Sequence, residues 1–100
     1  MNPTTTRNGR EVCSDIASEL KEIGTWLSSG KLDPETFRQA VLALEAAKVK
    51  RHGFTLEGAT SPNRHVIFRL RFAATGNLCA EMEFDPNSGD LETHHRCVSE

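Results

Sequence analysis

Two histidines and two cysteines in the carboxyl-terminal third of the chain have the side chains that could bind a metal. His94, His95 and Cys97 lie close together, and Cys79 falls on a neighbouring predicted strand. Imidazole and thiolate groups are the usual ligands of zinc. Alternation along a strand sends His94 and His95 to opposite faces, however, so both cannot reach one ion. Because His95 and Cys97 alone are too few ligands, we predict no metal site and no cofactor.

The segment 85–90, Asp-Pro-Asn-Ser-Gly-Asp, has the oxygen-rich composition of a calcium loop. Its glycine is the fifth residue, whereas the loop of a calcium-binding helix-loop-helix needs glycine at the sixth. A plain turn is therefore predicted. No spacing pairs a histidine with Cys13, Cys79 or Cys97 for nucleophilic catalysis, so each cysteine is expected to be a buried, inert thiol. We accordingly predict no catalytic residue and a protein that is not an enzyme.

Charged side chains alternate with apolar ones through the segment 64–97, which predicts a sheet with one charged face. Ile67 is the large apolar residue on the charged side. This open face has two interpretations, cross-strand ion pairs in contact with water or a recognition surface for another protein. The candidate protein-binding residues are Ile67, Arg69, Arg71, Glu81, Glu83, His94 and Arg96, with Glu92 beside them.

A basic set suggests a second class of function, nucleic-acid binding. It comprises Lys48, Lys50, Arg51, Arg64, Arg69 and Arg71. Phosphate binding would require these residues to converge in space without being neutralised by Glu81 and Glu83. A formal net charge of -2 and an open face without aromatic residues make this the weaker expectation. The basic residues at 48–51 also suit the end of a helix, where they meet the negative end of the dipole.

The elements that would position these residues form an α+β domain. We predict a two-helix hairpin packed on one face of a three- to four-stranded antiparallel meander, in the order α-α-β-β-β. One helix covers 11–28, and a second begins with Asp33 as N-cap and Pro34 at its first position. A short extra strand is expected at 54–57, a loop at 58–63 and the meander at 64–97.

The spacing of the apolar residues and the parity of the opposed residue numbers predict how these elements pack. In the second helix Phe37, Val41, Leu44 and Lys48 mark one row, and Gly53 is the expected left-handed cap. Gly24 weakens the first helix, and Trp26 lies at the edge of its apolar stripe. Parity pairs Phe84 with Leu91 and Met82 with Thr93. The covered face of the sheet should then hold Val66, Phe68, Leu70, Phe72, Leu78, Ala80, Met82, Phe84 and Leu91.

The chain of 100 residues has room for one domain. We predict a flexible tail at 1–9 and a single domain at 10–98. Three cysteines without paired spacing favour a reducing cytosol, and the polar amino terminus has no signal-peptide pattern, so a cytoplasmic location is expected. No run approaches a membrane span. If 91–97 is an edge strand, a homodimer through that edge is a further expectation.

The second helix and the meander with its turn Asp85-Pro86-Asn87-Ser88-Gly89 resemble the PepSY pattern, over about 33–97. This resemblance implies a regulatory or inhibitory module. The extra first helix and the lack of an export signal depart from that family. In size and in the absence of motifs the chain is also similar to small phage-encoded anti-defence inhibitors such as anti-CRISPR proteins. The leading expectation is thus a non-enzymatic protein-binding module, an adaptor or inhibitor, acting through the open sheet face or a sheet edge.

Overall fold

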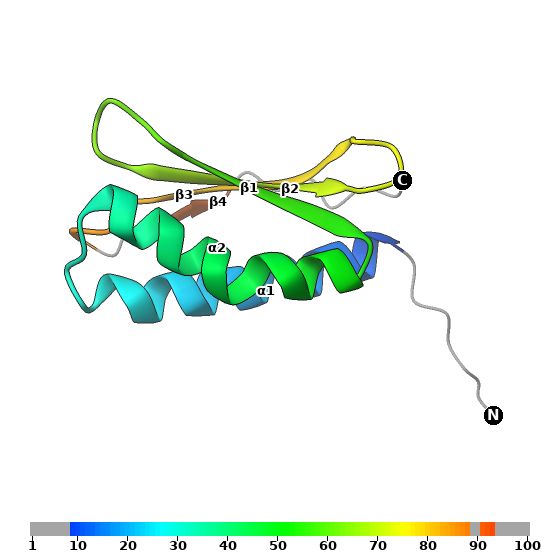
Figure 1. Ribbon diagram of the computed structural model, residues 1–100, viewed down its shortest axis with the longest axis horizontal. Helices are drawn as coiled ribbons and strands as arrows, with labels where there is room; N and C mark the ends of the chain where they lie inside the picture. Colours follow the sequence, from blue (N-terminus) through cyan, green and yellow to red (C-terminus); the bar gives the residue numbers. More distant parts are fainter. Residues whose placement is uncertain (1–8, 89–90, 94–100) are drawn as a thin grey trace.

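The computed structural model describes residues 9–88 and 91–93 (Figure 1). Its elements are α1 (Gly9–Ser28), α2 (Pro34–Arg51), β1 (Phe54–Thr60), β2 (Val66–Phe72), β3 (Leu78–Phe84) and β4 (Leu91–Thr93). The predicted fold class is confirmed, since two helices precede an antiparallel sheet. His94, His95, Arg96 and Cys97 lie outside the described residues, as does most of the predicted tail. None of the described helices is long and apolar enough to cross a membrane.

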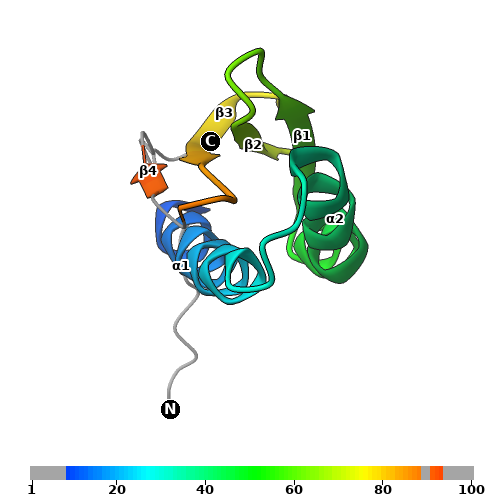
Figure 2. The same ribbon diagram turned by 90° about the vertical axis from the view of Figure 1, so that its left-hand side faces the viewer.

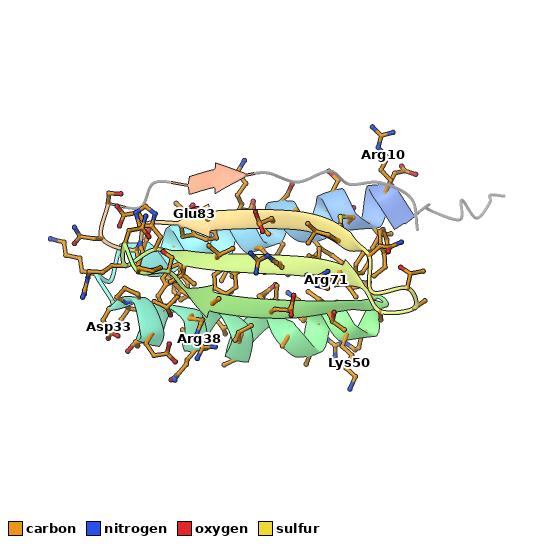
Figure 3. The ribbon with its side chains drawn as sticks, turned by 90° about the horizontal axis from the view of Figure 1, so that it is seen from above. Arg10, Asp33, Arg38, Lys50, Arg71 and Glu83 are labelled. Atoms are coloured by element: carbon orange, nitrogen blue, oxygen red, sulfur yellow. A yellow bond between two sulfur atoms is a disulfide. The ribbon has the colours of Figure 1, made fainter. Side chains whose placement is uncertain are left out.

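The described part of the chain forms two layers. The strands stand in the order β1-β2-β3-β4, with every neighbouring pair antiparallel. Both helices pack on the same face of the sheet, α2 along β1 and α1 along β3 (Figure 2). The other face is turned to the viewer in Figure 3, with the helices behind it. A meander with both helices on one side therefore leaves one face of the sheet uncovered by any described helix.

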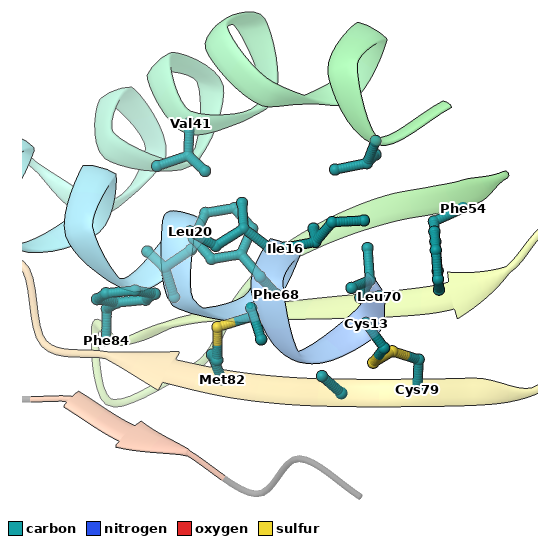
Figure 4. Packing of buried hydrophobic residues seen from close by; sticks show 14 of the residues in the cluster. Cys13, Ile16, Leu20, Val41, Phe54, Phe68, Leu70, Cys79, Met82 and Phe84 are labelled. Carbon is teal, nitrogen blue, oxygen red and sulfur yellow. A yellow bond between two sulfur atoms is a disulfide. The ribbon is translucent and has the colours of Figure 1, made fainter. Parts of the chain in front are cut away.

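The core lies between the two layers and is built around aromatic rings (Figure 4). Phe37 of α2 lies 5.5 Å from the ring of Phe84 and 6.2 Å from that of Phe68, and the rings of Phe68 and Phe84 are 5.8 Å apart. All three side chains are fully buried. Burial of aromatic surface at these spacings is the main favourable contribution to the free energy of folding in this region.

The second helix begins as its sequence predicts. Asp33 is the N-cap, and its carboxylate accepts a hydrogen bond from the backbone N–H of Thr36 at 3.2 Å. Hydrogen bonds from the Thr36 hydroxyl and backbone lower the pKa of Asp33. At the other end Gly53 has a φ of 88°, so the predicted left-handed conformation is confirmed.

The predicted apolar row of α2 is wrong at Leu44. The buried stripe instead runs through Phe37, Val41, Glu45 and Val49, in steps of four, and Leu44 is 48% exposed. Because α2 lies along β1, its deepest positions follow the contact with the sheet, and apolar residues elsewhere on the helix cannot be buried as well. A carboxylic acid thus occupies a core position.

The first strand is longer than predicted, and the expected loop at 58–63 is wrong in its first half. β1 continues through Gly58 to Thr60, pairing Gly58 with Phe68. A side chain at Gly58 would meet Arg38 Cγ at 2.9 Å and Phe68 Cε1 at 3.0 Å. The glycine that suggested a break is there because α2 and a core ring come close to the strand.

The hairpin registers agree with the parity argument except at one place. Phe84 pairs with Leu91 and Met82 with Thr93, as predicted. Between β2 and β3 the register shifts after the pair Leu70 and Ala80, and Arg71 then lies opposite Leu78. This bulge turns both Cys79 and Ala80 into the core. Leu78, predicted on the covered face, is therefore half-buried beside Arg71.

Because of the bulge, the prediction of free thiols is wrong for two cysteines. Cys13 in the first half of α1 and Cys79 at the bulge are both fully buried, as expected, but they form a disulfide (Figure 4). They are therefore not free thiols. The bond joins residues that are 66 positions apart and fixes α1 to β3. Spacing in the sequence could not show this pair, because only the bulge directs Cys79 toward the helix.

Candidate functional site

The open sheet face is the surface that the sequence singles out, and the structure places its residues in three rows across β1, β2 and β3. The strand register sets Ala59, Ile67 and Glu83 in the first row, Glu57, Arg69 and Glu81 in the second, and Thr55, Arg71 and Leu78 in the third. Five of the predicted binding residues, Ile67, Arg69, Arg71, Glu81 and Glu83, are thus brought together. The other two, His94 and Arg96, lie outside the described residues.

Ion pairs connect the strands across this face. Arg69 Nε lies 2.6 Å from Glu81 Oε2, and Arg71 Nε lies 2.7 Å from Glu57 Oε1. The guanidinium of Arg71 also donates to the carbonyl oxygen of Gly76 at 3.1 Å. The side chains of Arg69 and Arg71 are still more than a third accessible to water. Such pairs stabilise the fold by about 1 kcal/mol at most, but they hold the two arginine side chains in defined positions.

A histidine that the sequence did not single out extends the charged face. His65 Nδ1 lies 2.5 Å from Glu83 Oε2, and His65 Nε2 lies 3.7 Å from Asp85 Oδ2. His65 directly precedes β2, so its ring reaches the first row of the face from the loop. The resulting surface has a basic central strand, with Arg69 and Arg71, between acidic neighbours.

Ile67 lies in the first row of this charged surface. It is half-buried, with Ala59 opposite it on β1 and Glu83 opposite it on β3. Its side chain shares the open face with those of Arg69 and Arg71, because residues two apart on a strand point the same way. An accessible aliphatic side chain framed by charged groups has the composition of a small binding surface.

The basic set considered for nucleic acids does not converge. Arg69 and Arg71 are paired with Glu81 and Glu57. Lys48 Nζ lies 2.7 Å from Glu19 Oε2 on the helix side of the molecule. The rest of the set is split between the two ends of β1, with Lys50 and Arg51 at the end of α2 and Arg64 in the loop after β1. A strand of seven residues keeps these ends about 20 Å apart.

The described part of the 85–90 segment forms a turn. Asp85 Oδ1 accepts hydrogen bonds from the backbone N–H groups of Asn87 at 3.0 Å and Ser88 at 3.4 Å. These bonds, that from Asn87 foremost, lower the pKa of Asp85. The carboxylate is thus used to close the turn, and the described residues hold no group of three or more potential metal ligands.

Sequence reasoning missed a second polar cluster, on the helix side. Glu45 is 2% exposed, and it lies with Glu19 and Lys48 between α1 and α2. A groove of about 360 Å³ runs beside this cluster and is lined by Val12, Asp15, Ile16, Glu19, Lys48, Val49 and His52. Glu45 stands four residues from both Val41 and Val49, which is compatible with a buried position, but this spacing does not favour that row over the other apolar rows of α2.

Comparison with known proteins does not assign the chain to a family. No protein-family model, no curated protein and no solved structure matches the chain. The resemblance to the PepSY pattern therefore gains no support from a family model.

Proposed function

We propose that this protein is a non-enzymatic binding module, an adaptor or inhibitor that recognises another protein through its open sheet face. One observation carries the proposal. Both helices pack on one side of the sheet, so the opposite face is open (Figure 3). On that face Ile67 lies among charged side chains that cross-strand ion pairs already hold in position. A face held in this way loses little side-chain entropy on binding.

The charge pattern defines the partner surface that fits. Arg69 and Arg71 lie on the central strand, with Glu57 on one side and Glu81 and Glu83 on the other. A complementary protein would present acidic groups over β2, basic groups over β1 and β3, and an apolar site for Ile67. Charges of this kind act mainly on the association rate and on orientation, whereas a central apolar anchor acts mainly on dissociation.

The test is a rate measurement with the partner recovered by affinity capture from the native host. Arg69→Glu combined with Arg71→Glu should lower the association rate at least tenfold at low salt, with little change at high salt. Ile67→Ala should raise the dissociation rate by about tenfold or more. Lys50→Glu with Arg51→Glu is the matched control, since it changes the net charge equally at the end of α2.

Two results would contradict the proposal. Unchanged rates in the sheet-face variants, with the fold confirmed by circular dichroism, would remove the open face as the binding surface. A loss of binding in the control alone would move the interface to the end of α2 and revive the nucleic-acid alternative, which competition with single- and double-stranded DNA and RNA would check.

The edge-mediated homodimer is a secondary expectation of this proposal, whereas the cytoplasmic location predicted from the sequence has one observation against it. The disulfide weighs against a reducing compartment, because such bonds form and persist mainly under oxidising conditions. Of the two edge strands of the described sheet, β1 is partly covered by α2, whose Arg38 reaches the carbonyl oxygen of Gly58 at 3.5 Å. A dimer would therefore use the β4 edge, and sedimentation over a range of concentrations would detect it.

A further inference from the structure

Glu45 is a titratable side chain at a position where an apolar one would be expected. It lies between Val41 and Val49 in the buried stripe of α2, and its side chain is 3% accessible. One of its oxygens, Oε1, has no hydrogen-bond partner within the described structure. A charge in such a place is costly unless a partner compensates it, so the protonation state of Glu45 determines how stable this region is.

The groups that face Glu45 come from both helices. Glu19 of α1 lies beside the Glu45 carboxyl and can accept a hydrogen bond from it when Glu45 is protonated, and Lys48 lies 2.7 Å from Glu19 but 3.8 Å from Glu45. Arg51 of α2 contributes a charge that acts on Lys48, and Asp15 of α1 lines the same groove. His52 contributes a charge that acts on Glu19. On the sheet side, the covered faces of β1, β2 and β3 carry no ionisable side chain, since Cys79 is held in the disulfide.

One lysine thus serves two carboxyl groups, and the charges balance only when Glu45 is protonated. Burial is the main cause that raises the pKa of Glu45 to about 7, and the neighbouring Glu19 raises it further. The same hydrogen bond from Glu45, followed by that from Lys48, lowers the pKa of Glu19. The opposite directions of the two shifts place the shared proton on Glu45.

Two contacts attach α1 to β3 on either side of Glu19. Near one end the helix is bonded to β3 through Cys13 and Cys79, and near the other Gly24 lies directly against the ring of Phe84. Glu19 falls between these two attachments. A repulsion between Glu19 and Glu45 would therefore act on the stretch of α1 that borders the groove with its apolar lining of Val12, Ile16 and Val49.

We propose that Glu45 is a proton-operated latch between α1 and α2, closed when its carboxyl donates to Glu19 and opened when two carboxylates share Lys48, which widens the groove. This regulatory device lies on the helix side and is separate from the proposed sheet-face function. It is closed under acidic conditions and opens as the pH rises toward neutrality.

The expected change in the opening constant with pH follows from the raised pKa of Glu45. If Glu45 has an ordinary pKa of 4.5 when the latch is open and solvated, and about 7 when it is closed, the opening constant rises with pH between these values. The total increase is about 300-fold, since each pH unit within the window contributes at most a factor of ten. Below pH 4.5 and above pH 7 the opening constant should be nearly level.

Amide hydrogen exchange of the disulfide-bonded protein at several values between pH 5 and pH 8, corrected for intrinsic exchange, tests the latch. Amides of α1 and α2 near Glu19 and Glu45 should lose protection by about 70-fold, whereas those at the centre of β2 should not. Glu45→Gln can still donate the hydrogen bond but cannot ionise, so it should abolish this dependence. Glu22→Gln, on the exposed side of α1, should leave it intact.

A direct titration keeps the proposal testable if Glu45→Gln folds poorly. The side-chain carboxyl carbon of Glu45, followed by NMR in the unchanged protein, should titrate near pH 7 together with the loss of protection. An ordinary titration near pH 4.5, or local exchange that does not vary with pH, would overturn the proposal. A pH dependence that survived in Glu45→Gln and vanished in His52→Gln would overturn it as well, because the response would then belong to the imidazole.

Discussion

Gly24→Ala is the substitution for which the sequence and the structure predict opposite results. Within a helix, alanine is favoured over glycine by up to about 1 kcal/mol. In the folded protein, however, a Cβ at this position would overlap Cε1 and Cζ of Phe84 and would stand 3.0 Å from its Cδ1. The propensity of the helix predicts a more stable protein, and the packing predicts a less stable one.

The loss of stability caused by Gly24→Ala depends on whether the Phe84 ring can move aside. It is 1% exposed, and it packs against Phe37 and Phe68 at centroid distances of 5.5 and 5.8 Å. A ring held on two sides leaves only a shift of α1, and overpacking of this kind costs about 1 to 3 kcal/mol. After the gain in propensity, we expect Gly24→Ala to lower the free energy of unfolding by up to about 2 kcal/mol.

Urea unfolding followed by circular dichroism measures this difference. Thr25→Ala, at an exposed position of the same helix, is the matched control and should raise stability by a few tenths of a kcal/mol. Combining Gly24→Ala with Phe84→Leu should recover part of the loss, with a coupling energy of about 0.5 kcal/mol or more. A Gly24→Ala protein as stable as the control would refute the close contact between α1 and Phe84.

The remaining predictions concern the disulfide and the two faces of the sheet. Closing a loop of 66 positions corresponds to about 4 kcal/mol of stability, so Cys13→Ala with Cys79→Ala should lower the unfolding free energy by roughly that amount. Thiol counting under denaturing conditions without reductant should find one free thiol among the three cysteines of the chain, and three free thiols would contradict the bond. Phe68→Ala should cost roughly 3 to 5 kcal/mol because its ring is fully buried, whereas Arg69→Ala should cost about 1 kcal/mol or less. The reverse order in urea unfolding would mean that the assigned faces are exchanged.

The sheet was the more predictable part of the molecule. Alternation with a period of two determines which residues share a face, and the pairs Phe84 with Leu91 and Met82 with Thr93 followed from parity alone. The bulge after Leu70 could not be predicted in the same way, because it breaks the alternation without a glycine to mark it. Because of the bulge, Leu78 does not lie on the covered face that alternation predicted. The bulge is also the reason why the disulfide of Cys79 could not be predicted.

The second helix shows a different limit. Apolar residues occur on several of its sides, so its sequence does not select one buried row. Packing along β1 selects the row through Val41, Glu45 and Val49, and this contact depends on residues distant in the sequence. The polar cluster around Glu45 was missed for that reason, since a glutamate among apolar neighbours on a many-sided helix is read as exposed.

The candidate sheet site was predictable because charge alternation is local, whereas the groove was not because α1 and α2 create it together. The sheet and the two helices form opposite layers of the molecule (Figure 2). The charged rows belong to the strands, whereas the residues that line the groove belong to the helices, with His52 directly after α2. A protein bound to Ile67 would leave the groove accessible. The two proposals can therefore fail separately: Glu45→Gln should leave the partner's rates unchanged at pH 5, where the latch is closed in both proteins. If those rates change at pH 5, the helix layer and the sheet are coupled through the core. Binding of the partner would then depend on residues outside the open face.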